Sequence, residues 1–263
     1  MKITFLGTGT SHGVPMIACD CLTCRSEDPR DTRLRPSIYV EMEDGTGILV
    51  DAGPDLRLQA LTHRVRCVDA ILFTHGHADH ILGLDETRRF SALQRQPMRL
   101  YGDELTLADI QKMFAYVFDP ATPRGGGLPE LDLIRVEGPF TVKGHEIQPV
   151  PLLHGERPIL GFRFGPFAYL TDCNRIPEAS WPMLHNLEVV VLDALRIRPH
   201  PTHFSLDEAV EAARRIAARR TYFTHMCHDL AHAETNQRLP PGMELAYDGL
   251  IVRLSASGSG LSA

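Results

Sequence analysis

The 263-residue sequence lacks several features that would place it in a class at once. No apolar run comes close to the roughly 20 residues that cross a bilayer, and the first residues, MKITFLGTGTSHG, lack the apolar core of a secretory signal. An excess of positive charge is also absent, because the formal net charge is -6. This balance argues against broad binding to nucleic acid or to anionic membranes. We therefore expect a cytoplasmic protein without a membrane partner, for which nucleic acid is disfavoured.

The sequence also lacks a second cysteine pair. Three of its six cysteines, Cys19, Cys21 and Cys24, lie in CDCLTC, and the others are scattered. Disulfides are rare in the cytoplasm, so clustered thiols there more often bind a metal ion. A redox role for Cys21 and Cys24 is the alternative. The cysteines alone do not identify a fourth ligand, and Cys227 is one candidate.

The composition is that of an ordinary globular enzyme, with 43% hydrophobic and 23% charged residues. This length is compatible with one large domain, which we expect to span residues 1–263. Several apolar, β-branched runs end abruptly at a polar residue and predict buried strands. These runs are ITFLG (3–7), GILVD (47–51), VDAILFTH (68–75), IQPVPLLH (147–154), FAYLTD (167–172), VVVLD (189–193) and RTYFTH (220–225). If the strands lie side by side, their ends bring aspartate and histidine to one edge of the sheets.

Helical periodicity appears between these runs, at 84–94, 105–118 and 206–218. Ser205 is a predicted N-cap of the last helix. The stretch TPRGGGLPEL (122–131) predicts a mobile loop or the joint between two β-rich halves.

The strongest chemical signal is THGHADH (74–80), which follows an apolar run. One turn there can direct four metal-binding side chains toward one point, and three further strand ends add the rest of a seven-residue set. Zinc, manganese and iron all accept such ligands, and two ions about 4 Å apart use six or seven of them. The seven residues are His75, His77, Asp79, His80, His154, Asp172 and His225.

This motif, together with the downstream histidines and aspartate, resembles the metallo-β-lactamase superfamily. The resemblance implies an α/β (α+β) fold, the four-layer αβ/βα sandwich, with a dinuclear site of zinc or manganese at one edge of its sheets. It implies that His75, His77 and His154 bind one metal and that Asp79, His80 and His225 bind the other. Asp172 would bridge the two metals, and Asp51 would orient ligands without binding metal.

CDCLTC combined with THMCHD (224–229) resembles a narrower group, the phosphoribosyl cyclic phosphate phosphodiesterases of the carbon–phosphorus lyase pathway and their relatives. That resemblance implies a structural zinc held by Cys19, Cys21, Cys24 and His228. Four protein ligands leave no open coordination position, so the role would be structural. A homodimer is suggested by the same resemblance alone.

HPTHFSLDEA (200–209) resembles the histidine segment of superfamily phosphodiesterases, including the tRNA 3′-processing nucleases. The resemblance implies that His203 protonates the leaving group, with Asp207 or Glu208 as candidates to orient its imidazole. Asp79 is counted with His203 among the catalytic groups. The turn GTGTSHGVP (7–15) is expected to contact substrate, through Thr8, Thr10, Ser11 and His12.

We therefore expect an enzyme that hydrolyses a small or cyclic phosphodiester by attack of a hydroxide bound between two metals. Hydrolysis of a thioester or lactam by the same centre is one alternative, which the histidine segment disfavours. tRNA 3′ processing is another, which the acidic net charge and the lack of a long basic insertion disfavour.

Overall fold

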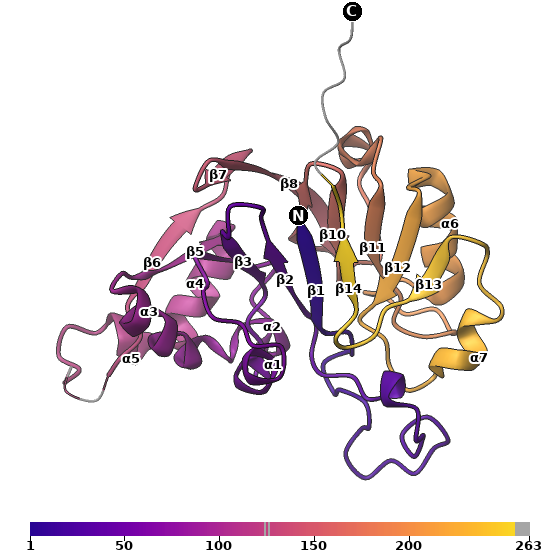
Figure 1. Cartoon of the computed structure of the whole chain (residues 1–263), viewed down its shortest axis with the longest axis horizontal. Coiled ribbons are helices and arrows are strands. Elements are labelled where there is room, and N and C mark those ends of the chain that lie inside the picture. Colours follow the sequence, from indigo (N-terminus) through magenta and orange to yellow (C-terminus); the bar gives the residue numbers. More distant parts are fainter. Residues whose placement is uncertain (124, 126, 256–263) are drawn as a thin grey trace, which may run out of the picture.

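The computed structural model describes residues 1–123, 125 and 127–255 as two seven-stranded sheets that pack face to face (Figure 1). The first sheet has the order β14 (Ile251–Arg253), β1 (Lys2–Gly7), β2 (Ser37–Glu41), β3 (Gly47–Val50), β4 (Ala70–Leu72), β5 (Met98–Gly102) and β6 (Leu131–Arg135). The second has the order β13 (Met243–Leu245), β12 (Arg220–Thr224), β11 (Val189–Asp193), β10 (Phe167–Leu170), β9 (Arg157–Phe164), β8 (His145–His154) and β7 (Phe140–Val142).

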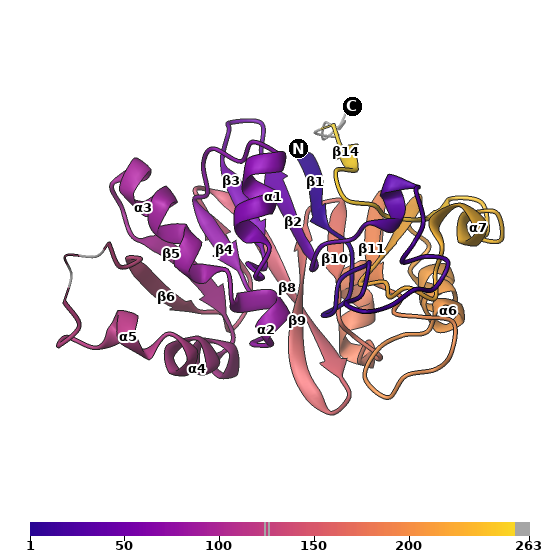
Figure 2. The ribbon, with the colours of Figure 1, turned by 90° about the horizontal axis from the view of Figure 1, so that it is seen from below.

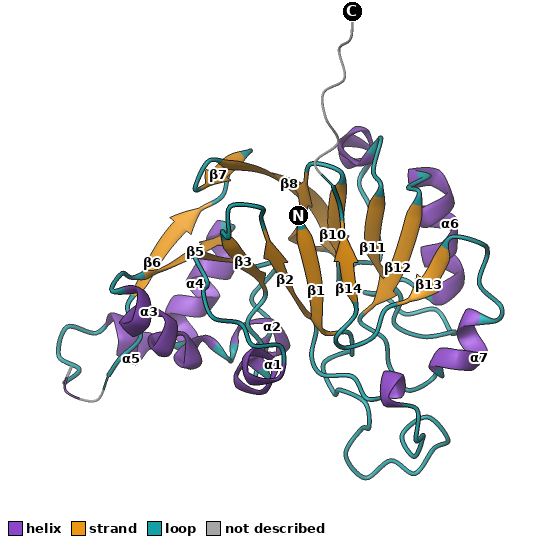
Figure 3. Cartoon of the chain, viewed as in Figure 1, coloured by secondary structure: helices purple, strands orange, loops and turns teal. Residues whose placement is uncertain are grey.

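Helices cover the outer face of each sheet and complete four layers (Figure 3). The first sheet carries α1 (Leu56–Thr62), α3 (Arg88–Gln94), α4 (Glu104–Met113) and α5 (Ala115–Phe118), and the second carries α6 (Leu206–Ile216). Short helices fill the connections: α2 (Ala78–Ile81), α7 (His232–Asn236) and the 3₁₀ turns η1 (Pro29–Asp31), η2 (Leu84–Thr87) and η4 (Glu178–Leu184). Among the described residues, no helix is long and apolar enough to cross a membrane.

The run VVVLD shows how an uninterrupted apolar sequence forms a strand that is buried on both faces. Val189 and Val191 of β11 pack into the core between the sheets, whereas Val190 and Leu192 pack on the other side against α6. A strand buried on both faces needs apolar residues at successive positions, which is why the run does not alternate. Its neighbours β10 and β12 pair with it in parallel, so their carboxyl ends meet at one edge of the sheet.

Two expectations about the connections need correction. The glycine run is not the joint between the halves, because β6 follows it and still belongs to the first sheet. The chain enters the second sheet between β6 and β7, and it returns to the first sheet with β14. Residues 124 and 126 of the stretch 122–131 lie outside the described residues. The helix predicted over 105–118 is interrupted at Phe114, whose φ of -108° and ψ of 37° end α4. The predicted N-cap Ser205 is confirmed, since it forms a capping box with Glu208.

Candidate metal centre

The strand ends meet at the lower edge of the two sheets in Figure 1, and Figure 2 shows the molecule from below. β4 leads into the loop and helix with His75 to His80, β8 ends at His154, and Asp172 and His225 directly follow β10 and β12. Two groups of ligand-type side chains result, the first partly and the second fully buried, with their ligand atoms within 4.8 Å of one another in each group. One group is His75, His77 and His154, and the other is Asp79, His80, Asp172 and His225.

The first group consists of imidazoles alone. The ring centroid of His77 lies 4.4 Å from that of His75 and 5.1 Å from that of His154. Burial lowers the pKa of all three histidines, most strongly for His75. They are therefore neutral near pH 7, and a neutral imidazole is the form that binds a metal ion.

The second group centres on Asp172. Its Oδ2 lies 2.7 Å from Nε2 of His80 and 3.4 Å from Nε2 of His225. The same carboxylate lies 3.2 Å from Nε2 of His75 and 3.4 Å from Nδ1 of His154. Asp172 therefore contacts histidines of both groups. Burial alone would lower the pKa of His225, but the charges of Asp172 and Asp79 raise it to about 9. A cation bound there would take the place of the proton that the carboxylates otherwise stabilise on the imidazole.

The donor set fits divalent cations. Buried ligand atoms of His75, Asp79, His80, His154, Asp172 and His225 point inward without a hydrogen-bond partner among the described residues. Unpartnered buried polar atoms are costly, and a cation would satisfy them together. Imidazole nitrogen and carboxylate oxygen suit zinc, manganese and iron.

Asp51 lies behind this group. Its carboxylate accepts hydrogen bonds from the backbone N–H and the hydroxyl of Thr74, both at 2.9 Å, and lies 2.8 Å from Nδ1 of His80. The contact on Nδ1 leaves Nε2 of His80 to face Asp172. Gly53, two residues on, packs so close that an added Cβ would lie 2.0 Å from the carbonyl oxygen of Asp79. Only glycine permits this approach between the two loops.

Three residues at the strand ends share a backbone conformation that side chains normally avoid. Asp51, Asp172 and His225 have φ of 63°, 61° and 62°. The left-handed region costs roughly 1–2 kcal/mol for a residue with a Cβ atom, and such outliers cluster at functional sites. Sequence patterns do not reveal this feature.

The CDCLTC loop meets the segment after β12. Nδ1 of His228 lies 3.2, 3.4 and 3.5 Å from the Sγ atoms of Cys19, Cys21 and Cys24. The backbone N–H of Cys24 lowers the pKa of the Cys21 thiol, which favours the thiolate. Cys227 is not part of this group, and all six cysteines, each within the described residues, are free of disulfides.

His203 lies beside the second group and is buried. Its Nδ1 is 3.0 Å from Asp172 Oδ1, and its ring stacks on His225 with centroids 4.9 Å apart. Neither residue expected to orient it does so. Glu208 is engaged by Ser205 in the capping box, and Asp207 lines a pocket on the outer face of α6. Besides Asp172, the carboxylate that faces His203 is Asp193, at the end of β11, with Oδ2 3.5 Å from the same Nδ1.

The turn after β1 divides its residues between two environments. Thr10, Ser11 and His12 line a pocket of about 330 Å³ that also contains His203, Arg196 and Arg198. Thr8 is fully buried and does not line that pocket; its hydroxyl donates a 2.7 Å hydrogen bond to Asp248. The expectation that Thr8 contacts substrate is therefore replaced by a structural contact.

That contact predicts a pH effect on stability. Burial raises the pKa of Asp248 to about 7, although hydrogen bonds from Leu34 and Thr8 oppose the shift. Since the folded pKa exceeds the unfolded value near 4, the stabilising contribution is full below about pH 4 and is lost as pH rises through 7. Asp248→Asn removes the charge; its amide oxygen can accept the Leu34 N–H, and its amide N–H can donate to the Thr8 hydroxyl, which then acts as acceptor. Relative to wild type, it should gain at most about 4 kcal/mol of unfolding free energy between about pH 4 and 8. Urea unfolding at both pH values measures this, and parallel pH curves for the two proteins would contradict it.

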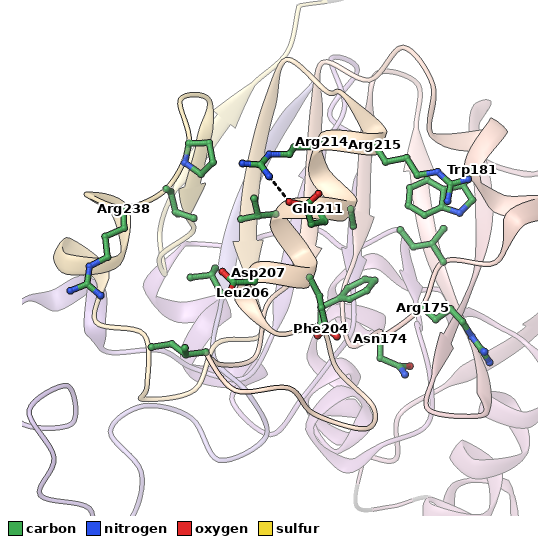
Figure 4. Close-up of a pocket in the computed structure, with 17 residues that line it drawn as sticks. Asn174, Arg175, Trp181, Phe204, Leu206, Asp207, Glu211, Arg214, Arg215 and Arg238 are labelled. Carbon is green, nitrogen blue, oxygen red and sulfur yellow. Dashed lines mark hydrogen bonds and ion pairs between the residues drawn. The ribbon is translucent and has the colours of Figure 1, made fainter.

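A pocket of about 980 Å³ lies away from the histidines, on the outer face of α6 (Figure 4). Its arginines are paired with acidic residues: Arg214 with Glu211, and Arg215 with Glu178. The guanidinium of Arg215 also lies 3.8 Å from the ring centroid of Trp181. Its arginines are paired, and no metal-type cluster lies among its described residues, so this pocket lacks the donor set found at the histidines.

Comparisons with known proteins agree with the geometry. The family model described as Beta-lactamase superfamily domain matches residues 46–226. Among solved structures, a diphosphatase from the PhnP family is similar over 95% of this chain and 96% of its own, with 46% identity and a TM-score of 0.89. Zinc-bound PqqB from Methylobacterium extorquens, at 20% identity, covers 97% of this chain and 100% of its own with a TM-score of 0.78. The predicted four-layer α/β fold is confirmed.

The curated relatives are longer. The Octanoyltransferase of Porphyromonas gingivalis is 34% identical over 260 residues, which make up 98% of this chain and 52% of that protein. Coenzyme PQQ synthesis protein B of Methylorubrum extorquens is 31% identical over 123 residues, 42% of this chain and 40% of that protein. The chain thus spans about half the length of the first of these relatives and matches less of the second.

Proposed function

The chain belongs to the β-lactamase superfamily of metal-dependent hydrolases, and from this premise we propose that it is a phosphodiesterase acting on a small or cyclic phosphodiester. The observation that carries the proposal is the position of His203. A histidine 3.0 Å from the central carboxylate of Asp172, at the wall of a pocket, can reach a group bound over the metal centre. Hydrolysis of a thioester or lactam does not require a histidine at this position beside the metal ligands.

We assign His75, His77 and His154 to one divalent cation, and Asp79, His80 and His225 to a second, with Asp172 shared. Asp51 fixes the ring of His80 through Nδ1. When bound, zinc or manganese ions supply Lewis acidity, which neutralises phosphoryl charge and makes water a nucleophile near neutral pH.

The chain's own groups complete the reaction. His203 delivers a proton to the departing oxygen, so that an alkoxide does not have to leave with its full negative charge. Thr10, Ser11 and His12 hold the substrate beside it, within the pocket that His203 lines. Arg196 and Arg198 give this pocket positive charge, which suits an anionic substrate.

The Cys19, Cys21, Cys24 and His228 group is proposed to hold a structural zinc. His228 lies three positions after His225, so this ion would tie the loop after β1 to the loop that carries a ligand of the catalytic centre. Its expected effect is to make that rim rigid.

A second candidate is cleavage of a phosphoanhydride, because the PhnP-family structure at 46% identity is described as a diphosphatase. Both reactions attack phosphorus and would use the same groups. They differ in the leaving group, which is an alkoxide in an alkyl diester and a phosphate in a diphosphate. A phosphate is stable without added protonation, so His203 matters less for it.

The test compares zinc- and manganese-loaded protein on a 2′,3′-cyclic nucleotide, a nucleoside diphosphate ester and a thioester. We expect phosphodiester cleavage, which His80→Ala abolishes and His203→Ala slows by about 10²–10⁴-fold with unchanged metal content. Comparable rates for His203→Ala and wild type on the cyclic nucleotide would remove His203 from the mechanism. Thioester cleavage alone would refute the phosphodiesterase proposal, and diphosphate cleavage alone would favour the second candidate.

A further inference from the structure

Asp193 is a buried carboxylate for which the proposed reaction has no role so far. It ends β11 and is 0% exposed. Its Oδ2 accepts a hydrogen bond from the backbone N–H of Phe204 at 3.0 Å, and its Oδ1 has no partner among the described residues. Burying a carboxylate with a single hydrogen bond is costly, so its surroundings should contain further donors.

Two imidazoles face this carboxylate. Nδ1 of His225 lies 3.5 Å from Oδ1, and Nδ1 of His203 lies 3.5 Å from Oδ2. Both Nδ1 atoms are buried and have no hydrogen-bond partner in the described part of the chain. The two rings are stacked with an angle of 14° between their planes, and both present Nδ1 to Asp193. Each contact is only a few tenths of an ångström longer than a hydrogen bond.

We propose that Asp193 is a positioning residue that accepts the Nδ1–H groups of His225 and His203 together. Resting on the proposed function, this assigns one carboxylate to align a metal ligand and the proton donor. With Nδ1–H held by Asp193, His225 presents Nε2 toward Asp79 and Asp172, which lie 3.6 and 3.4 Å away. Nδ1 of His203 also lies 3.0 Å from Oδ1 of Asp172, but that carboxylate is assigned to the metals, which leaves Asp193 to accept the Nδ1–H of His203. Any shift of β11 would therefore move both groups.

Asp193 could instead be a metal ligand, because Asp172, Asp193, His203 and His225 also have ligand-type atoms within 4.8 Å of one another. The geometry favours positioning. Oδ2 is already used by the Phe204 amide, and His225 directs Nδ1 to Asp193 while its other nitrogen faces the opposite carboxylates. Aligning a ligand histidine through its second nitrogen is the usual task of such a carboxylate.

Asp193→Asn tests the proposal. Asparagine has nearly the same shape and can still accept the Phe204 N–H, but its amide nitrogen donates where an imidazole needs an acceptor. In the metal-loaded protein, we expect the metal affinity measured by chelator competition to fall about 10–100-fold, with unchanged stoichiometry at saturating metal. We expect kcat on a 2′,3′-cyclic nucleotide to fall by about 10²–10³-fold at nearly constant KM. On bis(p-nitrophenyl) phosphate, whose leaving group needs no proton, the loss should be clearly smaller.

Thr224→Val is the matched control, because Thr224 is a buried polar residue at the end of the neighbouring strand β12. It should change neither the metal affinity nor the ratio of the two rates. If Asp193→Asn does not fold, judged by circular dichroism, Asp193→Ser removes the carboxylate and receives the same measurements. Loss of one full metal equivalent at saturation would make Asp193 a ligand and overturn the proposal. Wild-type metal affinity together with a wild-type rate ratio would also overturn it. If wild type cleaves neither diester, the proposed function fails, whereas the chelator measurement still decides on Asp193.

Discussion

Asp172→Ala is expected to release the metals of the catalytic centre and to lower hydrolysis by at least about 10³-fold. Asp172 is 2% exposed and lies within 3.4 Å of ring nitrogens on His75, His80, His154 and His225, so its carboxylate contacts both ligand groups. Its removal takes away the carboxylate shared by the two groups, and the imidazoles and Asp79 that are left hold divalent cations more weakly.

The measurement is metal content per chain by mass spectrometry, together with kcat on a phosphodiester. Under the proposed assignment, wild type carries three equivalents, two in the catalytic centre and one on the cysteines. Cys24→Ser is the matched control, because it should lose the third equivalent and retain the other two. An Asp172→Ala protein that folds, retains all its metal and hydrolyses at the wild-type rate would refute the shared role of Asp172.

The features that the sequence predicts well are those in which one physical cause acts locally. The run VVVLD predicts a buried strand because both faces of β11 are covered, and LDEAVEAARRI predicts α6 because one face meets the core. The strand-end rule also brings His75, His154, Asp172 and His225 to one edge, since parallel neighbours end on the same side. These predictions need no knowledge of distant contacts.

The roles of similar residues are harder to predict, because they depend on angle and depth. Asp172 and Asp193 both end apolar runs, and no local signal distinguishes the carboxylate between the ligand groups from the one behind His203 and His225. Thr8 and Thr10 are two positions apart, yet one contacts Asp248 and the other lines the pocket. The glycine run marks a loop correctly, but it cannot indicate which sheet receives the next strand.

The second large effect concerns Arg33, the largest fully buried side chain. Its guanidinium forms an ion pair with Asp31 at 3.1 Å and donates hydrogen bonds to the carbonyl oxygens of Cys227 and Leu230 at 3.0 and 2.5 Å. Asp31 in turn accepts the backbone N–H of His232. One cation thus joins the loop before β2 to the loop after β12, and Cys227 lies between His225 and His228.

Arg33→Met should lower the free energy of unfolding by about 3–5 kcal/mol, because it leaves the Asp31 charge and two carbonyl oxygens buried without their donor. For a chain of this size, that corresponds to a fall in Tm of roughly 6–20 °C. The measurement is thermal and urea unfolding of the metal-loaded protein, with zinc release as a second signal, since the displaced loop carries His228.

Arg30→Ala is the matched control, because Arg30 forms an exposed ion pair with Asp28 in the same loop and should leave the Tm nearly unchanged. Adding Asp31→Leu to Arg33→Met should recover part of the loss, because it removes the uncompensated charge. If Arg33→Met unfolds at the same temperature as Arg30→Ala, the buried ion pair does not hold the two loops together, and the rigidity of the rim must come from the cysteine and His228 group alone.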